Sequence, residues 1–178
     1  MLFVTVLKSQ TQLQNLLMTT AEFNQCVDQH SDAVYRFILK NIKDQDKASD
    51  VVQDSFTKMW EKVKEIPVDK ARSYLFTTAY HTLIDTIRKD QRMTAFDDYK
   101  HDKETVENGY SDLKEILDEA IAKLPPIQRS VLMLRDYEGY PYDEIGQMTN
   151  LNESQVKVYI FRARSFLKSY IKNLDRVI

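Results

Sequence analysis

Apolar residues recur every three or four positions through most of the chain, which is the spacing of one face of an α-helix. In the first half this pattern predicts three helices, over about residues 23–42, 48–66 and 70–92. Pro67 should end the second helix, because proline lacks an amide donor and disfavours helix in the residue before it. Three consecutive amphipathic helices predict a small helical bundle.

The second half predicts four helices. An apolar stripe from Leu113 to Leu124 meets Pro125 and Pro126, which close one helix and begin the next. Gly139 suits a left-handed cap at the end of that second helix, and a short helix should follow over 142–148. Asn152 and Gln155 then have the spacing of a capping box that starts a long helix. A short helix, a tight turn and a long helix form the helix-turn-helix pattern, whose second helix enters the major groove of DNA.

Between the two halves, the helical period stops over residues 94–111. This stretch carries five acidic residues against two lysines, namely Asp97, Asp98, Asp102, Glu104 and Glu107 with Lys100 and Lys103. It therefore predicts a flexible acidic linker. The expected fold class is all-α, with two small helical domains over 21–93 and 112–178. Residues 1–20 form an N-terminal extension, and Met18 within it precedes a helix-start pattern, so residues 1–17 are assigned no function.

Composition narrows the class of protein. With three glycines and four prolines among 178 residues, the chain is typical of a helical globular protein. It has no run of about 20 apolar residues and its opening MLFVTVL lacks a signal-peptide pattern, so we expect a cytoplasmic protein. The single Cys26 excludes an internal disulfide, and no Cys/His cluster has zinc-site spacing. No metal or other cofactor is expected.

Positive charge concentrates in the last predicted helix. From Glu153 onward there are six basic and two acidic residues, whereas residues 112–152 carry four basic and eight acidic ones. Basic side chains at that place would displace the counterions of DNA. The side chains expected to reach base edges are Ser154, Gln155, Lys157, Val158 and Phe161, with Arg162 and Arg164 on phosphates or in intramolecular pairs. A solvated basic stripe on a surface helix is the alternative interpretation.

The second half contains several short motifs at characteristic spacings: Leu124-Pro125-Pro126, Gly139, Tyr142-Asp143-Glu144-Ile145, Val156-Lys157 and Arg162-Ala163-Arg164. In this order the motifs resemble region 4 of bacterial sigma factors of the extracytoplasmic-function group. The first half resembles region 2 of the same family, through residues 50–56 with Trp60 and then residues 74–81 followed by Asp85 and Arg88-Lys89. The resemblance covers about residues 22–170. Two positions depart from it, since His81 stands where the family typically has asparagine and Tyr74 where it has tryptophan.

The resemblance implies an alternative-type sigma factor that binds core RNA polymerase, recognises the −35 and −10 promoter elements, helps to melt DNA and directs transcription initiation. It assigns Asp50, Gln53 and Asp54 to the polymerase-docking surface. It assigns contacts with the melted −10 element to Lys70, Arg72, Tyr74, Tyr80, His81, Asp85, Arg88 and Lys89, and contacts with the −35 element to Ser154, Gln155, Lys157, Val158, Phe161 and Arg162. A membrane-anchored anti-sigma protein is a further partner that the family often has.

Unpaired bases expose hydrogen-bonding edges and ring faces that a duplex hides, so a pocket that captures one such base favours melted DNA. Tyr74, Phe76 and Tyr80 are the candidate rings for stacking, although Leu75 and at least one of these rings should be buried in the core. His81 and Asp85, one turn apart, could contact bases or each other.

Two other classes of function fit parts of the sequence. A helix-turn-helix regulator that acts without polymerase explains the second half but gives the first half no role. An enzyme would use His81 with Asp85, or Asp50 with Asp54, as metal ligands or acid–base groups. No third ligand, activated nucleophile or glycine-rich phosphate loop accompanies either pair, so the sequence favours a protein that is not an enzyme.

Overall fold

The computed structural model describes residues 17–94 and 113–174, and within these residues the regular structure is helical. The first part contains α2 (Thr20–Ile42), α3 (Gln45–Glu61) and α4 (Ala71–Thr94). The second part contains α5 (Leu113–Ala122), α6 (Pro126–Leu132), α7 (Tyr142–Thr149) and α8 (Glu153–Leu174). We call α2–α4 the first bundle and α5–α8 the second bundle. The predicted all-α class is confirmed, while the predicted linker at 94–111 lies almost entirely outside the described residues.

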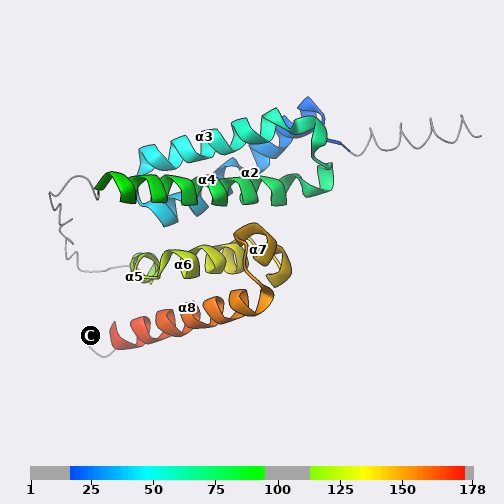
Figure 1. Cartoon of the computed structure of the whole chain (residues 1–178). Helices are drawn as coiled ribbons and strands as arrows, with labels where there is room; N and C mark the ends of the chain where they lie inside the picture. Colours follow the sequence, from blue (N-terminus) through cyan, green and yellow to red (C-terminus); the bar gives the residue numbers. More distant parts are fainter. Residues whose placement is uncertain (1–16, 95–112, 175–178) are drawn as a thin grey trace, which may run out of the picture.

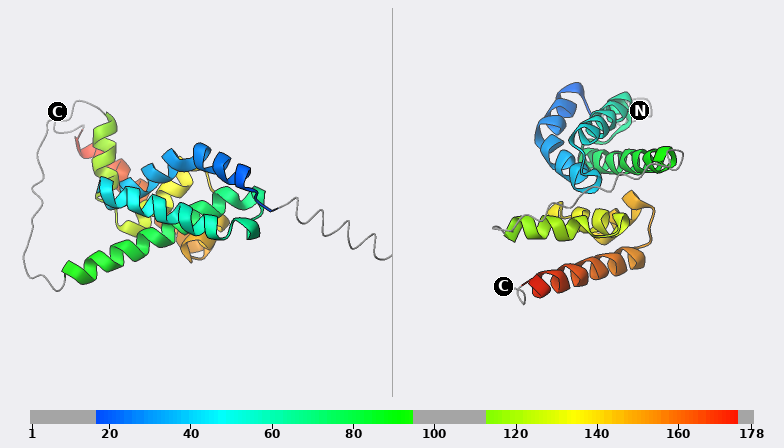
Figure 2. Two further views of the ribbon diagram at one scale, coloured as in Figure 1. Left: turned by 90° about the horizontal axis from the view of Figure 1, so that it is seen from above. Right: turned by 90° about the vertical axis from the view of Figure 1, so that its left-hand side faces the viewer.

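The helices are arranged in layers. In Figure 1 the first bundle lies above α5, α6 and α7, and α8 lies below them. Figure 2 shows from two further directions that the two bundles pack directly against each other. None of the described helices is long and apolar enough to cross a lipid bilayer.

Local caps explain where the helices of the first bundle begin and end. The Thr19 hydroxyl accepts from the Glu22 amide, and the Glu22 carboxylate accepts from the Thr19 amide at 2.7 Å, which completes a capping box at the start of α2. Lys43 adopts a left-handed conformation (φ 61°) after α2, and Asp44 then caps α3. The break between α2 and α3 is therefore only two residues long.

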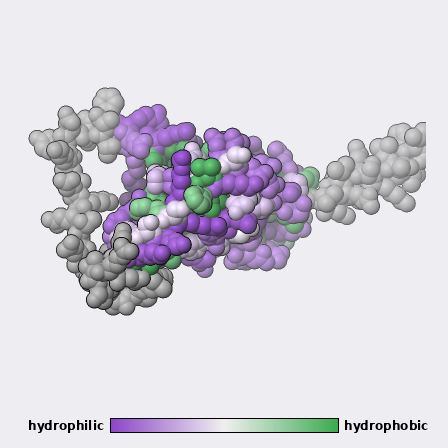
Figure 3. All heavy atoms as spheres, turned by 90° about the horizontal axis from the view of Figure 1, so that it is seen from below, coloured by the Kyte–Doolittle hydropathy of each residue, from purple (hydrophilic) through white to green (hydrophobic). Residues whose placement is uncertain are grey.

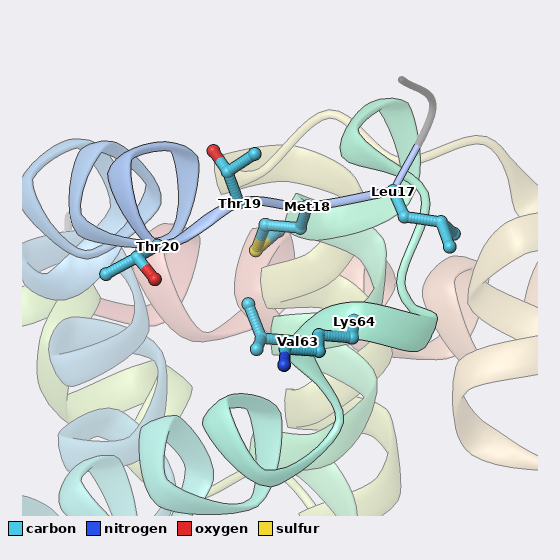
Figure 4. A pocket seen from close by; sticks show the side chains of 6 residues that line it. All are labelled: Leu17, Met18, Thr19, Thr20, Val63 and Lys64. Carbon is cyan, nitrogen blue, oxygen red and sulfur yellow. The ribbon is translucent and has the colours of Figure 1, made fainter. Parts of the chain in front are cut away.

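The second helix of the first bundle is shorter than the apolar pattern predicts. It ends at Glu61, and a 3₁₀ turn over Val63–Glu65 leads to Ile66, which is 2% exposed. The chain before α2 pairs with this segment, since the Met18 amide donates to the Ile66 carbonyl at 2.9 Å. Met18 is buried, and Figure 4 shows its side chain beside Val63 in a hollow of about 430 Å³.

The second bundle contains a widened turn that the sequence pattern does not reveal. As predicted, Pro126 is the first residue of α6. After Leu132 the helix continues as a π-helical turn over Met133–Tyr137. Gly139 follows with φ 77°, a left-handed conformation that L side chains adopt only with strain, and this confirms its predicted capping role. The π-helical turn and Gly139 together redirect the chain toward α4 before α7 begins.

One continuous hydrophobic core joins the two bundles. Phe37 of α2 and Phe76 of α4 are fully buried with ring centroids 5.8 Å apart. The ring of Tyr140, from the loop before α7, packs edge-to-face on Phe76 at 5.5 Å. The second bundle therefore inserts an aromatic side chain into the core of the first bundle.

Candidate nucleic-acid interface

Helices α7 and α8 form the predicted helix-turn-helix, and Gly146 explains how closely they approach. A Cβ atom at Gly146 would lie 2.6 Å from the Leu151 carbonyl oxygen, which is closer than real side chains come to backbone. The Leu151 amide also donates to the Gly146 carbonyl at 2.9 Å. Only glycine permits this close approach without a backbone shift, and the apolar pattern of the sequence gives no sign of this requirement.

The caps of the turn fix the direction of α8. Asn150 ends α7 in a left-handed conformation (φ 57°), which asparagine tolerates better than most residues. The Asn152 side chain accepts from the Gln155 amide at 2.8 Å, and the Gln155 side chain accepts from the Asn152 amide at 3.0 Å. The predicted capping box is therefore confirmed, and it occupies the Gln155 side chain that was expected to reach a base edge.

Helix α8 has one buried face and one exposed face, as its pattern predicts. Val156, Ile160 and Ala163 are at most 2% exposed and pack on the second bundle. All six side chains assigned to the −35 element are exposed: Ser154, Gln155, Lys157, Val158, Phe161 and Arg162. Figure 3 views the molecule from the side on which α8 lies, and hydrophobic patches interrupt a mostly hydrophilic surface there. Phe161 is 71% exposed, which is unusual for a phenylalanine in a folded helix.

Two basic side chains of α8 have partners within the second bundle. The Lys157 ammonium lies 2.6 Å from the Glu153 carboxylate, whose hydrogen bond raises the pKa of Lys157, and it also lies over the Tyr142 ring. Arg164 forms two hydrogen bonds with the Asp136 carboxylate in the π-helical turn. Of the two roles weighed for Arg164, the structure shows the intramolecular pair.

Helix α4 presents part of the predicted −10 set to solvent. Arg88 and Lys89 are exposed near its C-terminal end, Asp85 lies 3.9 Å from Arg88, and Lys70 is exposed just before the helix. His81 is half-buried and its ring packs on Tyr80. These exposed basic side chains form a surface that could follow a nucleic-acid backbone.

The aromatic residues of α4 divide between surface and core. Tyr74 is half-buried, whereas Phe76 is fully buried and Leu75 is also buried, as expected. Tyr80 is only 5% exposed, and burial raises the pKa of its phenol. The prediction that Tyr80 stacks on an unpaired base is corrected, because the ring faces that stacking requires are covered by the core.

Arg72 is held by the second bundle. One guanidinium nitrogen donates to the Glu138 carboxylate at 2.9 Å and to the Glu138 carbonyl at 2.8 Å. The guanidinium also lies over the Tyr140 ring at 4.6 Å from its centroid. Next to it, the Ser73 hydroxyl donates to the Glu144 carboxylate at 3.0 Å. The sequence pattern indicates Arg72 but not its contacts with Glu138 and Tyr140 or the contact of Ser73 with Glu144, because no sequence pattern shows which residues of two separate bundles meet.

Helix α3 carries the predicted polymerase-docking residues on its exposed face, since Asp50, Gln53 and Asp54 are all exposed. At the end of the same helix, Trp60 is 45% exposed and packs on Phe23 of α2 with ring centroids 5.0 Å apart. Among the described residues, no group of three or more His, Cys, Asp or Glu side chains is arranged to hold a metal ion.

Comparisons with known proteins agree with this geometry. A model of sigma-70 region 2 matches residues 26–93, and a model of sigma-70 region 4 matches residues 114–167. The chain is 28% identical over 158 residues to RNA polymerase sigma factor SigV of Bacillus subtilis, covering 84% of this chain and 91% of that protein. It is 29% identical over 142 residues to the ECF sigma factor SigM of the same organism, covering 76% of this chain and 86% of that protein.

Solved structures share the fold. The sigma factor RpoE of Bartonella quintana, in complex with the anti-sigma factor NepR, matches with a TM-score of 0.71 and 24% identity over 84% of this chain and 96% of that chain. CnrH, in complex with the cytosolic domain of CnrY, matches with a TM-score of 0.60 and 21% identity over 85% of this chain and 88% of that chain. Since matches to the two sigma-70 regions span both bundles and the relatives are ECF sigma factors, the chain belongs to the extracytoplasmic-function group of the sigma-70 family.

Proposed function

We propose that this protein is an RNA polymerase subunit of the initiation step: it joins core polymerase, recognises promoters through two separate DNA elements and helps to open the duplex. It supplies recognition and leaves catalysis to the polymerase. Because its partners are polymerase and promoter DNA, it would act in the cytoplasm. The observation that carries the proposal is a capped helix-turn-helix with an exposed recognition face in the same chain as a region 2 bundle.

In this proposal α8 reads the −35 element. Its N-terminal turns follow the tight turn over residues 150–152, which packs against Gly146, and they present Ser154, Lys157 and Val158 outward. Phe161, with 71% of its surface exposed, can contact a thymine methyl group in the major groove. Arg162 is exposed one position further and would contact phosphate.

In the same proposal α4 holds the non-template strand of the melted −10 element. Lys70, Arg88 and Lys89 would follow the backbone, and the half-buried side chains of Tyr74 and His81 would contact bases. Tyr80 is left out because it lies in the core. Arg72 belongs to this surface only when Glu138 releases it.

Exposed acids on α3 support its proposed role in docking on polymerase. Asp50 and Asp54 lie one helical turn apart, and like charges at that spacing repel each other slightly. Both are exposed, with Gln53 between them. A basic partner surface would remove this repulsion, and a polymerase subunit is the partner that the sigma family implies.

A transcription assay with purified components tests the proposed function. The full chain alone should give weak promoter binding, and sequence-specific transcripts should appear only after core polymerase is added. Replacing Gln53 and Asp54 by alanine should weaken polymerase binding while the thermal unfolding curve stays unchanged. The matched control replaces Gln25 and Asp28, an exposed amide and acid on α2. Failure of the purified chain to associate with core polymerase at low salt would contradict the proposal.

The same assay separates this function from the alternative of a stand-alone regulator. A helix-turn-helix regulator should bind its promoter tightly without polymerase, and the first bundle would then be dispensable. The region 2 match over residues 26–93 supports a role for that bundle which a stand-alone regulator does not need.

An anti-sigma protein is a further partner that we propose. The similar folds of RpoE and CnrH were both solved in complexes, with the anti-sigma factor NepR and with the cytosolic domain of CnrY. Copurification from the native host, followed by identification of the bound proteins, tests this proposal. Recovery of the chain with core polymerase alone would contradict it.

A further inference from the structure

A short segment before α2 lies outside the part of the chain that the family match covers. We call residues 17–19 the strap, and residues 62–70, which join α3 to α4, the α3–α4 loop. The match to sigma-70 region 2 begins at residue 26, so it gives the strap no role. In the structure the strap lies against the α3–α4 loop (Figure 4), and it therefore belongs to the folded first bundle.

Backbone contacts join the strap to the loop. The Met18 amide donates to the Ile66 carbonyl at 2.9 Å, and Leu17 and Pro67 form an antiparallel bridge. By contrast, the Lys70 amide donates to the Pro67 carbonyl at 2.9 Å, which closes a turn within the loop itself. The strap therefore constrains the loop from a distant part of the sequence.

The side chain of Met18 lies at the junction between the loop and the start of α4. Met18 is 3% exposed, and Figure 4 shows its side chain directed toward Val63. It lines the hollow of about 430 Å³ beside Val63 and Lys64, and also a second hollow of about 200 Å³ beside Ala71 and Arg72. Removing this side chain would therefore leave the loop and the first turn of α4 without packing support at their junction.

The capping box at the start of α2 anchors the other end of the strap. The Glu22 carboxylate accepts from the Thr19 amide at 2.7 Å and from the Thr19 hydroxyl at 2.8 Å. Because α2 begins at Thr20, the strap cannot shift without breaking this cap or the hydrogen bond to Ile66. The strap thus connects a fixed helix end to the loop.

The α3–α4 loop leads directly into the surface that we propose holds the melted −10 element. Its last residue, Lys70, is exposed, and Tyr74 follows one turn into α4. Val63 and Ile66 of the loop are at most 8% exposed, so the loop is packed on the side that Met18 reaches. A binding site works only when its side chains are held within about 0.5 Å of the productive geometry. A displaced loop would move Lys70 and Tyr74 relative to the DNA strand.

We propose that Met18 is a positioning residue for recognition of the melted −10 element: from this junction it fixes the α3–α4 loop, and hence Lys70 and the first turns of α4, against the DNA strand. This inference rests on the proposed function, which supplies that strand. Met18 itself would not touch DNA, because it is 3% exposed. Its removal should weaken discrimination of the −10 sequence and spare polymerase docking, since Asp50 and Asp54 lie on the exposed face of α3.

Holoenzyme binding to two promoter fragments tests the inference. The fragments carry an intact or a scrambled −10 element beside the same −35 element, and the ratio of their affinities measures discrimination. We expect Met18→Ala to lower this ratio roughly five-fold, the low end of what a base contact contributes. Met18→Leu, which nearly conserves volume, should restore the ratio. Equal ratios for Met18→Ala and the unaltered protein would overturn the inference.

A second core variant separates positioning from stability. Val34→Ala shortens a fully buried side chain in the middle of α2, away from the strap. It should lower the thermal unfolding temperature and leave −10 discrimination unchanged. An equal loss of discrimination in Val34→Ala and Met18→Ala would show that Met18 acts only through stability, and would overturn the inference. Met18→Val is the replacement if Met18→Ala does not fold, and it should give a smaller fall in the same direction.

Hydrogen exchange of the free chain, followed by mass spectrometry, gives a local readout that needs no DNA. Met18→Ala should speed the exchange of amides in residues 62–70, because the loop loses its packing and its bond to the strap loosens. Val34→Ala should speed exchange around the middle of α2 instead. Unchanged exchange of the loop in Met18→Ala would contradict the role of the strap.

These outcomes are distinguishable from failure of the proposed function. If the unaltered chain gives no core-dependent transcription, the sigma role is wrong, and the DNA role of Met18 is wrong with it even where exchange shows that the strap holds the loop. If transcription is normal and every variant discriminates the −10 sequence equally, the sigma role stands and the positioning role of Met18 is wrong.

Discussion

The N-terminal turns of α4 and of α8 are both predicted to contact DNA, yet their surroundings differ. On α8 the predicted contact side chains are exposed, up to 71% for Phe161. On α4, Arg72 and Ser73 are engaged by Glu138 and Glu144 of the other bundle. Residue types therefore identify a surface that can bind DNA. Whether its side chains are free to contact DNA depends on the hydrogen-bond acceptors that the rest of the chain brings to them.

The largest effect should come from a cross-link that holds α4 against the second bundle. In a Cys26→Ser background, Ser73→Cys and Glu144→Cys can be joined by a short, reducible thiol cross-linker, since the native side chains are in hydrogen-bond contact. Because the linked protein cannot separate α4 from the second bundle, promoter-directed transcription should fall by a factor on the order of 100. Transcription measured before and after reduction gives the comparison.

Each single cysteine variant treated with the same reagent is the control for modification alone. Reduction of the linked double variant should restore transcription to the level of the untreated protein. Full activity in the cross-linked state would show that α4 and α7 can stay together on a promoter, and the contrast between the two helices would lose its functional meaning.

Variants on the exposed helix should have an intermediate effect. Phe161→Ala or Lys157→Ala should weaken holoenzyme binding to a promoter with an intact −35 element by about 1–3 kcal/mol, and should reduce the discrimination against a scrambled element. Lys168→Ala, on an exposed turn further along α8, should weaken both promoters equally because it would contact phosphate. Binding to the two promoters, compared for all three variants, checks this expectation; equal losses for all three would remove base reading from α8.

The smallest effect should come from Tyr140→Phe. Among the described residues, no donor or acceptor lies within hydrogen-bond distance of the buried Tyr140 hydroxyl, and burial raises the pKa of this phenol well above its usual range. Deleting an unsatisfied hydroxyl should leave the folded protein unchanged in stability or stabilise it by up to about 1 kcal/mol. Denaturant unfolding and oligonucleotide affinity measure the change; a clear loss of stability would reveal a hydrogen bond at this hydroxyl.

Local signals in the sequence predict most of the helices and the turn between α7 and α8. The apolar period predicts α2, α4 and α8 closely, and Asn152 with Gln155 predicts the cap that the structure confirms. The end of α3 was placed five residues too late, because Val63 and Ile66 are buried through a 3₁₀ turn and still continue the apolar pattern. Apolar spacing reports burial, and burial does not require an unbroken helix.

Interactions between the bundles could not be predicted in the same way. Glu138, Tyr140 and Glu144 are near one another in sequence, but their partners lie more than 60 positions away. The apolar pattern gives no sign of the π-helical turn over Met133–Tyr137 that precedes them. The candidate surfaces could therefore be predicted from residue types. Only the three-dimensional structure shows which side chains of the other bundle contact them.

Arg129 donates hydrogen bonds both within the second bundle and across to the first bundle. Its buried guanidinium donates to the carbonyls of Ile121, Ala122 and Leu124, at the end of α5 and just after it, and also to the Lys40 and Asn41 carbonyls at the end of α2. The three bonds to residues 121–124 belong to the second bundle alone and would persist after separation, so only the donor facing α2 would pass to water. A mutational scan would record Arg129 as essential for folding. It would not separate that role from the contact that Arg129 makes with the end of α2. Separation of the two bundles would leave the Arg129 guanidinium hydrogen-bonded to residues 121–124 and would not strand its charge in an apolar interior.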